Sequence, residues 1–283
     1  MICACYRHTN KVVVIHSYQL YGVRLEGFHS WQRVFFLYLY PFVPDGAEKD
    51  CIEIPYLLCG DSGCSLDFTI HRGYGYMAVN WMQKDREKKT QTLYQIPLDS
   101  SDEKKEVAKV TGYVPLINVN ETRGNHIYFT TSCYLDKDGT EEELLNYEWN
   151  ILDGSTKKLN IPKGEVLLAV RGNRYFCYQD GKGLRSYDEN GKNEKKLFEW
   201  QYEISSVCRD EKYLYFDNEP CADSVSERRI MVVDYDGNVI CERKNMTENS
   251  PEIIWSDSKQ VLLQNIEKET YQILNVKEIS TLK

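Results

Sequence analysis

The chain has no apolar run long enough to cross a membrane as a helix. Such a span needs about 18 to 20 consecutive apolar residues. The most apolar stretch covers residues 34–43 and is interrupted by Pro41. A short stretch rich in aromatic and branched residues predicts a buried β-strand, so we expect no transmembrane segment.

The chain has fewer basic residues than acidic residues. The chain has 35 Lys and Arg against 43 Asp and Glu, which gives a formal net charge of −8. Phosphate backbones are bound by basic faces, so this balance argues against a nucleic-acid partner. The lysine-rich stretches at residues 84–89, 104–105 and 192–196 alternate with acidic residues in expected loops, which indicates solvated turns.

Motifs of nucleophilic or phosphate chemistry are also missing. The chain has no Gly-x-Ser-x-Gly nucleophile elbow, and its Gly181-Lys182-Gly183 stretch lacks the spacing of a phosphate-binding loop. The histidines follow no recurrent pattern: His8, His16, His29, His71 and His126. We interpret His126, in the turn before a strand, as a solvated polar residue. We predict no catalytic residue, no metal ligand and no cofactor-binding residue.

The ten cysteines do not form a compact disulfide framework. They are Cys3, Cys5, Cys51, Cys59, Cys64, Cys133, Cys177, Cys208, Cys221 and Cys241. Their scatter, and the mid-strand positions expected for Cys177 and Cys208, favours small buried thiols. Cys59 and Cys64 have a spacing typical of metal ligands, but a zinc site would need two more. A disulfide or two free thiols is the favoured interpretation.

What the chain does have is tyrosine, 21 residues against 9 Phe and 5 Trp, in a recurring pattern. A turn is followed by a tyrosine-rich strand at residues 124–129, 172–176 and 210–216. A second strand then ends in an Asp or Asn turn with glycine, at Asp153-Gly154, Asn190-Gly191 and Asp236-Gly237. Such turns suit tight hairpins because glycine accepts a positive φ. Repetition at this spacing is the mark of a propeller or solenoid.

The repeats predict an all-β fold, a β-propeller of six four-stranded blades, with five or seven blades as alternatives. We expect a single domain over residues 1–283, with clear blade repeats at 61–283. Residues 1–60 fit the rhythm poorly and are expected to be a divergent first blade or a ring-closing segment; a faulty gene start would also explain them. No convincing helix is expected, and the acidic segment 141–145 is expected to lead into a strand.

The strands can be placed from the pattern in the clearer units. The third unit predicts strands at residues 116–120, 127–134, 144–152 and 155–159. The fourth predicts 166–170, 175–178, 184–187 and 195–198. The fifth predicts 204–208, 213–216, 230–234 and 239–242, and the sixth 253–255, 261–264, 271–274 and 279–282.

Several loops could carry a ligand. In the segment Asp136-Lys137-Asp138-Gly139-Thr140-Glu141, the alternating acids and the glycine turn are like part of a calcium loop. The third alternating ligand and the bidentate Glu are missing, so a polar hairpin tip is the favoured interpretation. The turn at Asp234 is interpreted in the same way. The longest loops cover residues 82–90, 134–143 and 218–229, the last with Pro220-Cys221-Ala222-Asp223, and are candidate rims of a binding site.

The Gly-Asn-x-Ile-Tyr-Phe burst with its following Tyr-Asp-x-x-Gly turn resembles six-bladed propellers of the TolB/YWTD type, over about residues 60–283. In particular it resembles uncharacterised lipoprotein-like propellers of gut Clostridia. This resemblance implies a bacterial, extracellular or cell-surface binding module, although no intact signal peptide is present. Those proteins often carry Cys-x(4)-Cys with a trailing Lys and His. Here Cys59 and Cys64 match, but Ser65 and Leu66 replace that pair, which removes support for a metal or redox role.

These features favour a non-catalytic binding or interaction module over an enzyme. The expected inner strands offer Asn118, Asn120 and Glu252 but no acidic or histidine cluster. The expected ligand is a peptide, glycan or protein, and the expected state is a monomer. The alternative is a metal-dependent propeller enzyme, lactonase-like or lyase-like, with its site at the central channel. A purely structural scaffold is the third interpretation.

Overall fold

The computed structural model of the chain is built from antiparallel β-strands, with one short 3-10 helix. It describes residues 2–8, 11–21, 31–41, 50–59, 64–81, 87–97, 104–199, 206–217, 228–246, 252–256, 258–265 and 270–281. The chain divides into two compact units, Met1–Leu159 and Asn160–Lys283, called unit 1 and unit 2 below. The single domain expected over residues 1–283 stays a prediction.

Unit 1 begins with a four-stranded sheet in the order β1-β2-β3-β4. Its strands are β1 (Ile2–His8), β2 (Lys11–Tyr21), β3 (Trp31–Pro41) and β4 (Asp50–Cys59). The apolar stretch at residues 34–43 supplies most of β3, as the sequence predicted. The four strands β1–β4 therefore form an up-and-down meander, although the sequence of this region carries little of the repeat.

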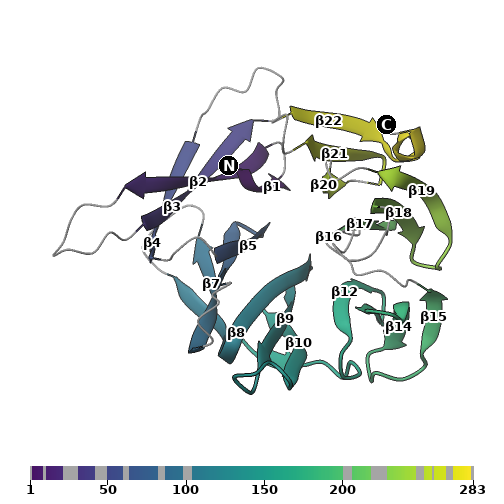
Figure 1. Cartoon of the computed structure of the whole chain (residues 1–283), viewed down its shortest axis with the longest axis horizontal. Helices are drawn as coiled ribbons and strands as arrows, with labels where there is room; N and C mark the ends of the chain where they lie inside the picture. Colours follow the sequence, from purple (N-terminus) through teal and green to yellow (C-terminus); the bar gives the residue numbers. More distant parts are fainter. Residues whose placement is uncertain are drawn as a thin grey trace. The chain divides into compact units, whose positions relative to one another are not determined.

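The second sheet of unit 1 has seven strands in the order β11-β10-β9-β8-β7-β6-β5 (Figure 1). The strands are β5 (Cys64–His71), β6 (Tyr74–Trp81), β7 (Lys88–Pro97), β8 (Lys105–Arg123), β9 (His126–Tyr134), β10 (Glu142–Asn150) and β11 (Thr156–Lys158). As expected, the acidic segment 141–145 leads into a strand, β10.

The long strand β8 corrects the expectation of a separate inner strand at residues 116–120. Its first half pairs with β7 and its second half with β9. Between the halves, Val114 has a φ of 48° and is followed by Pro115, which has no N–H to donate. The register to β9 shifts between Tyr113 and Leu116. The chain bends there without leaving the sheet, so two predicted units share one strand.

A hydrophobic cluster joins the two halves of this sheet. It contains Tyr76, Ala78, Leu93, Ile117, Val119, Ile127, Phe129 and Trp149, each no more than 9% exposed. The Trp149 ring meets Tyr76 edge to face, with 5.9 Å between centroids, a favourable aromatic geometry. In the same sheet, Thr130 accepts a hydrogen bond from Asn120 and donates one to Asn146 over 2.7 Å, which satisfies these buried polar groups.

Unit 2 contains three consecutive meanders (Figure 1). The first is β12 (Val166–Arg171), β13 (Arg174–Gln179), β14 (Gly183–Asp188) and β15 (Lys195–Phe198). The second is β16 (Ser206–Arg209), β17 (Tyr213–Asp217), β18 (Arg228–Asp234) and β19 (Val239–Met246). The third is β20 (Glu252–Ser256), β21 (Gln260–Asn265) and β22 (Thr270–Asn275). These strands lie where the sequence predicted them.

The strand expected at residues 279–282 is wrong: a 3-10 helix, η1 (Val276–Thr281), stands there. Branched residues at the C-terminus favour a strand by propensity. However, Val276 and Ile279 are one helical turn apart and lie together in a core cluster, where they are 5% and 0% exposed. Burial of both side chains outweighs the local preference, so the last described sheet ends at β22.

The middle meander of unit 2 is buried on both faces. On β18, Ile230 and Val232 lie in a cluster with β20, β21 and η1. The alternate residues Met231 and Val233 lie in a second cluster with Phe176 and other residues of the first meander. Because side chains of a strand alternate between faces, one strand serves both cores.

The hairpin turns have the backbone that the Asp/Asn-Gly pattern predicted. Gly154, Gly191 and Gly237 have φ values of 71°, 71° and 91°, a region that glycine adopts readily. At Gly237 the backbone of the preceding meander also approaches closely: an added Cβ would lie 2.4 Å from the Leu197 carbonyl oxygen. This turn therefore needs glycine both for its conformation and for the contact.

Replacing Gly237 by alanine is expected to lower the free energy of unfolding by roughly 3 kcal/mol. About 1 to 2 kcal/mol comes from the left-handed conformation and the rest from displacing the Leu197 backbone. Gly181→Ala is the matched control, because Gly181 has a φ of 72° and no atom within 4 Å of an added Cβ. Urea denaturation measures both variants; equal losses would contradict the close-contact argument.

Candidate functional site

The loop at Asp136 is a self-contained hairpin tip. Its carboxylate accepts hydrogen bonds from the Thr140 hydroxyl and from the backbone N–H groups of Thr140 at 2.9 Å and Glu141 at 3.2 Å. The Thr140 hydrogen bond lowers the pKa of Asp136. The oxygens that a calcium ion would need hold the turn together, which supports the interpretation as a polar tip.

Asp234 serves its own turn in the same way. It accepts from the backbone N–H groups of Asp236 at 3.0 Å and Asn238 at 2.8 Å, and from the Asn238 side chain at 2.9 Å. Burial raises its pKa, but the hydrogen bonds from Asn238 outweigh burial and the pKa lies below its usual value. Among the residues that the structure describes, no group of three or more His, Cys, Asp and Glu could hold a metal ion.

His126 is more than the solvated residue that the sequence suggested. Its Nδ1 lies 2.7 Å from Glu148 Oε1, and the two side chains are 38% and 19% exposed. The pairing arises because β9 and β10 place His126 opposite Asn150, two residues from Glu148. Sequence could not reveal this partner, which lies on the next strand.

Other positions singled out in the sequence do not converge. The side chain of Asn120 is committed to Thr130, and Asn118 is exposed on β8. Cys59 ends β4 and Cys64 begins β5. The intervening residues 60–63, the rim segments 82–86 and 218–227, and with the latter the Pro220-Cys221-Ala222-Asp223 turn, lie outside the described residues.

Four cysteines have side chains that the structure describes: Cys133, Cys177 and Cys241 are buried, as predicted for Cys177, and Cys208 is partly buried. Cys133, Cys177, Cys208 and Cys241 are free. Burial raises the pKa of each, for Cys208 to about 12. Cys208 Sγ lies 3.3 Å from the Ile253 carbonyl oxygen, to which it donates. Because the thiolate is the reactive form, none of these four is a good nucleophile.

A dense polar cluster in unit 2 centres on the carboxylate of Asp210, in the turn between β16 and β17. Within this turn, Asp210 accepts from the N–H groups of Lys212 at 2.8 Å and Tyr213 at 2.9 Å. It also accepts from the Tyr215 hydroxyl at 2.6 Å. Ser258, in the turn between β20 and β21, donates both its N–H and its hydroxyl over 2.6 Å. One carboxylate thus ties two meanders together.

The backbone carbonyl of Asp210 ties in the first meander as well. It accepts from Arg171 Nη2 at 2.5 Å and from the Tyr235 hydroxyl at 2.8 Å. The Arg171 guanidinium lies over the Tyr235 ring, 4.5 Å from its centroid, a cation–π contact. Arg171 is the last residue of β12, so the first turns of consecutive meanders are connected in a chain.

Unit 1 has a comparable connection. His71, the last residue of β5, lies with Nε2 2.7 Å from the carbonyl oxygen of Gly124, in the turn between β8 and β9. His71 and Arg171 therefore occupy equivalent positions and each reaches a carbonyl in the corresponding turn farther along the chain. Polar contacts at the turns therefore connect neighbouring sheets in unit 2 and two distant parts of one seven-stranded sheet in unit 1.

Asp210→Asn is expected to cost about 3 kcal/mol of unfolding free energy at pH 7, because an amide cannot accept all these donors. Burial raises the pKa of Asp210, but the hydrogen bonds, led by that from Ser258, lower it overall. A lowered pKa stabilises the fold above the unfolded value of about 3.9, and that contribution is lost as the pH falls through the folded pKa. The difference between variant and parent should therefore shrink in acid.

Chemical denaturation between pH 7 and pH 3 measures this difference. The matched control is Asp236→Asn in an exposed turn, which should change stability by less than about 0.5 kcal/mol at any pH. A loss for Asp210→Asn that is the same at both ends of the pH range would contradict the role of its charge.

One of the buried carboxyl groups, that of Glu165, lies just before β12. It is 2% exposed and accepts a hydrogen bond from the Tyr187 hydroxyl over 2.9 Å. Burial raises the pKa of Glu165, while the hydrogen bond from Tyr187 and the charge of Arg185 act in the opposite direction. The sequence carries no sign of this residue, because its contact with Tyr187 depends on how β13 pairs with β12 and with β14.

A raised carboxyl pKa means that the ionised form opposes folding, so stability falls as the pH rises from the unfolded value through the folded pKa. Glu165→Gln keeps an oxygen for Tyr187 and removes the charge. We expect this variant to be more stable than the parent at pH 7 and equal to it near pH 3, by thermal unfolding. Glu189→Gln, at an exposed turn, is the control; a destabilised Glu165→Gln at pH 7 would contradict the argument.

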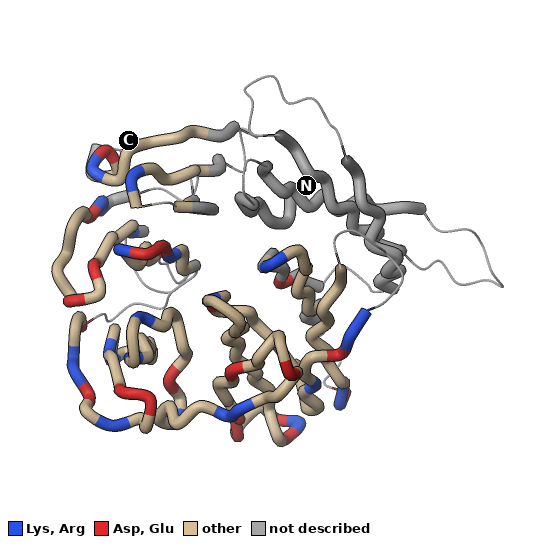
Figure 2. Tube along the Cα trace, turned by 180° about the vertical axis from the view of Figure 1, so that it is seen from behind, with Lys and Arg blue, Asp and Glu red and all other residues tan. Residues whose placement is uncertain are grey.

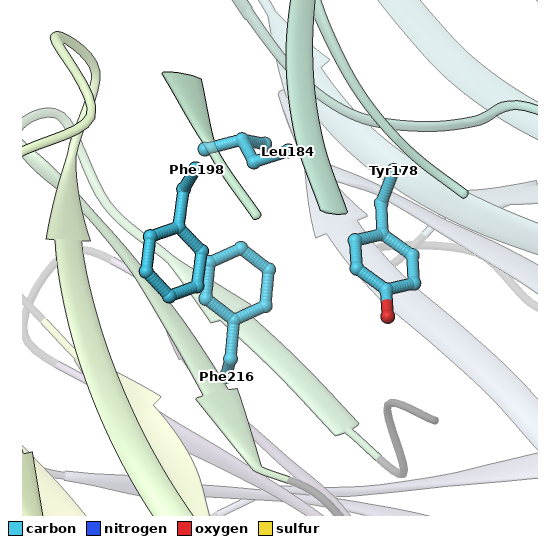
Figure 3. Close-up of a pocket in the computed structure, with 4 residues that line it drawn as sticks. All are labelled: Tyr178, Leu184, Phe198 and Phe216. Carbon is cyan, nitrogen blue, oxygen red and sulfur yellow. The ribbon is translucent and has the colours of Figure 1, made fainter. Parts of the chain in front are cut away.

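The apolar gap in unit 2 lies between the first and second meanders (Figure 3). Its empty volume, open solvent included, is about 130 Å³, and it is lined by Tyr178, Leu184, Phe198 and Phe216. The rings of Tyr178 and Phe216 lie 6.3 Å apart. Ligand pockets usually measure about 300 Å³ or more and include polar groups that orient the ligand. This gap is a packing feature between two sheets.

Comparison with known proteins gives fold relatives only. No family model matches the chain, and no curated protein matches it. Acylaminoacyl peptidase of Pyrococcus horikoshii aligns with a TM-score of 0.54 and 13% identity over 96% of this chain and 44% of its own. An acylaminoacyl peptidase in complex with Z-Gly-Gly-Phe-chloromethyl ketone gives 0.56 and 11% over 98% and 45%. The β-propeller domain of the Trilobed protease from Pyrococcus furiosus gives 0.46 and 11% over 96% and 92%.

The chain spans less than half the length of the two peptidases. The part of them that it matches is their β-propeller domain, and with its antiparallel meanders the chain has a β-propeller fold. At such identities the likeness shows fold alone, because propellers support many unrelated functions. No described helix is long and apolar enough to cross a membrane.

Proposed function

We propose that this β-propeller is a non-catalytic binding module that recognises a peptide, glycan or protein ligand. The observation that carries the proposal is that three of its described aspartates hold the protein's own turns together. Asp136, Asp210 and Asp234 each accept two or more backbone N–H groups. Carboxylates used in this way are not placed to act on a substrate.

We also propose six blades. Dividing β8 at Val114 groups the strands into five sets of four and one of three: β1–β4, β5–β8, β8–β11, β12–β15, β16–β19 and β20–β22. The sequence resemblance to TolB/YWTD-type propellers supports the same count, a bacterial source and a place at the cell surface. A monomer is the state we expect.

Binding and turnover distinguish the proposal from a metal-dependent enzyme. The purified full chain is applied to glycan and peptide arrays, and separately incubated with lactone and ester substrates in calcium or zinc. We expect ligand binding on an array and no turnover above the protein-free blank. Turnover that a chelator abolishes, together with bound metal by elemental analysis, would replace the binding module with the enzyme.

A further inference from the structure

The third meander of unit 2 ends in a strand whose outer side has no partner in the described part of the chain. The first two meanders of this unit have four strands and close with β15 and β19. The third has the order β20-β21-β22, and η1 follows directly after β22. One strand position beside β22 is therefore open among the described residues.

The register shows which backbone groups of β22 face that side. Gln260 is paired with Asn275, and the Val276 N–H donates to the Lys259 carbonyl over 2.9 Å. Bonded and non-bonded pairs alternate along an antiparallel ladder. Residues 270, 272 and 274 therefore bond to β21, while Tyr271, Ile273 and Asn275 direct their N–H and C=O groups outward.

One end of this outer edge is closed. The Asn275 N–H donates to the Glu278 carboxylate over 2.8 Å, which is the outward direction that the register requires. The hydrogen bond covers the edge next to η1. The N–H and C=O groups of Tyr271 and Ile273 remain as the pairing positions, and the Ile273 side chain is 52% exposed.

The composition of β22 also sets it apart from other outer strands. The outer strands of four sheets or half-sheets carry charges or proline: Asp50, Glu53 and Pro55 on β4, Lys157 and Lys158 on β11, Lys195 and Lys196 on β15, and Glu242, Arg243 and Lys244 on β19. Such residues discourage pairing with another chain. Strand β22 has no charged residue and is tan along its described length in Figure 2.

We propose that the outer edge of β22 binds an extended peptide segment of a partner protein, which adds a fourth strand to this meander. The inference rests on the proposed binding function and names its ligand class. The bound peptide would have uncharged residues in the segment that pairs with β22. Basic residues would flank that segment, because the chain has a net charge of −8. A second copy is the weaker occupant, since one short edge buries far less than the roughly 1,200 Å² of a stable interface.

Amide hydrogen exchange of the full chain, resolved by residue with NMR, tests the edge directly. The amides of Tyr271 and Ile273 should exchange fast, and those of Gln272 and Leu274 slowly. The blocked peptide Lys-Thr-Val-Thr-Val-Thr-Lys should slow the first pair. Slow exchange of the Tyr271 and Ile273 amides without peptide overturns the proposal. If exchange is slow at all protein concentrations, the chain itself covers the β22 edge. If it is slow only at high concentration, a second copy covers that edge.

Two substitutions at Ile273 test the same edge by fluorescence anisotropy with that peptide. Ile273→Pro removes the outward N–H but no bond to β21, and Ile273→Lys adds the charge found on other outer strands. We expect at least a tenfold weaker affinity for each. Ile240→Lys, at a 40% exposed position on β19, is the matched control and should bind like the parent. If the proline variant does not fold, the affinity of Ile273→Lys for the peptide decides the test.

The outcomes separate this inference from the proposed function. Equal affinity of parent and Ile273→Lys, or a parent affinity weaker than about 1 mM, overturns the β22 edge as a peptide site. Array binding would still support a binding module in that case. Metal-dependent turnover would overturn both.

Discussion

Burial of both faces of a sheet is the constraint on which unit 2 depends. A strand in its middle meander places alternate residues in two different cores, Ile230 and Val232 in one and Met231 and Val233 in the other. Such a strand has no polar face, so it cannot stand alone in water. Each meander therefore requires its neighbours, and the hydrophobic contribution of a single strand is shared between two contacts.

Polar contacts at the turns position the meanders of unit 2 relative to one another. The Asp210 carboxylate and carbonyl connect the first turns of three successive meanders through Arg171 and Ser258, and reach the β18–β19 turn through Tyr235. Partly buried charged hydrogen bonds of this kind are costly to leave incomplete. Close backbone contacts act with them, as at Gly237, where even a methyl group would meet the neighbouring meander. Hydrophobic burial in the cores holds the meanders of unit 2 together, and the contacts at the turns set the position of each meander against the next.

In the described part of this acidic chain, several groups that could act in catalysis have structural contacts instead. Asp136, Asp210 and Asp234 accept hydrogen bonds within their own turns or between meanders. The described thiols are buried or partly buried, and His126 lies beside Glu148. The feature that stands apart is β22, an uncharged outer strand where other sheets carry lysine, acid or proline. A binding function built on backbone groups would need no cluster of reactive side chains, and so would leave no motif in the sequence.

The sequence alone predicted the all-β class, the positions of most strands in residues 116–275 and the glycine turns. Strand alternation and Asp/Asn-Gly turns are local signals that a short window of residues carries. It could not predict that β8 runs through two units, that Ile279 lies in a helix, or that Glu165 is buried and Asp210 meets Ser258. Those features depend on which distant strands become neighbours. Strand register and side-chain burial arise from contacts between two segments, so neither segment alone determines them.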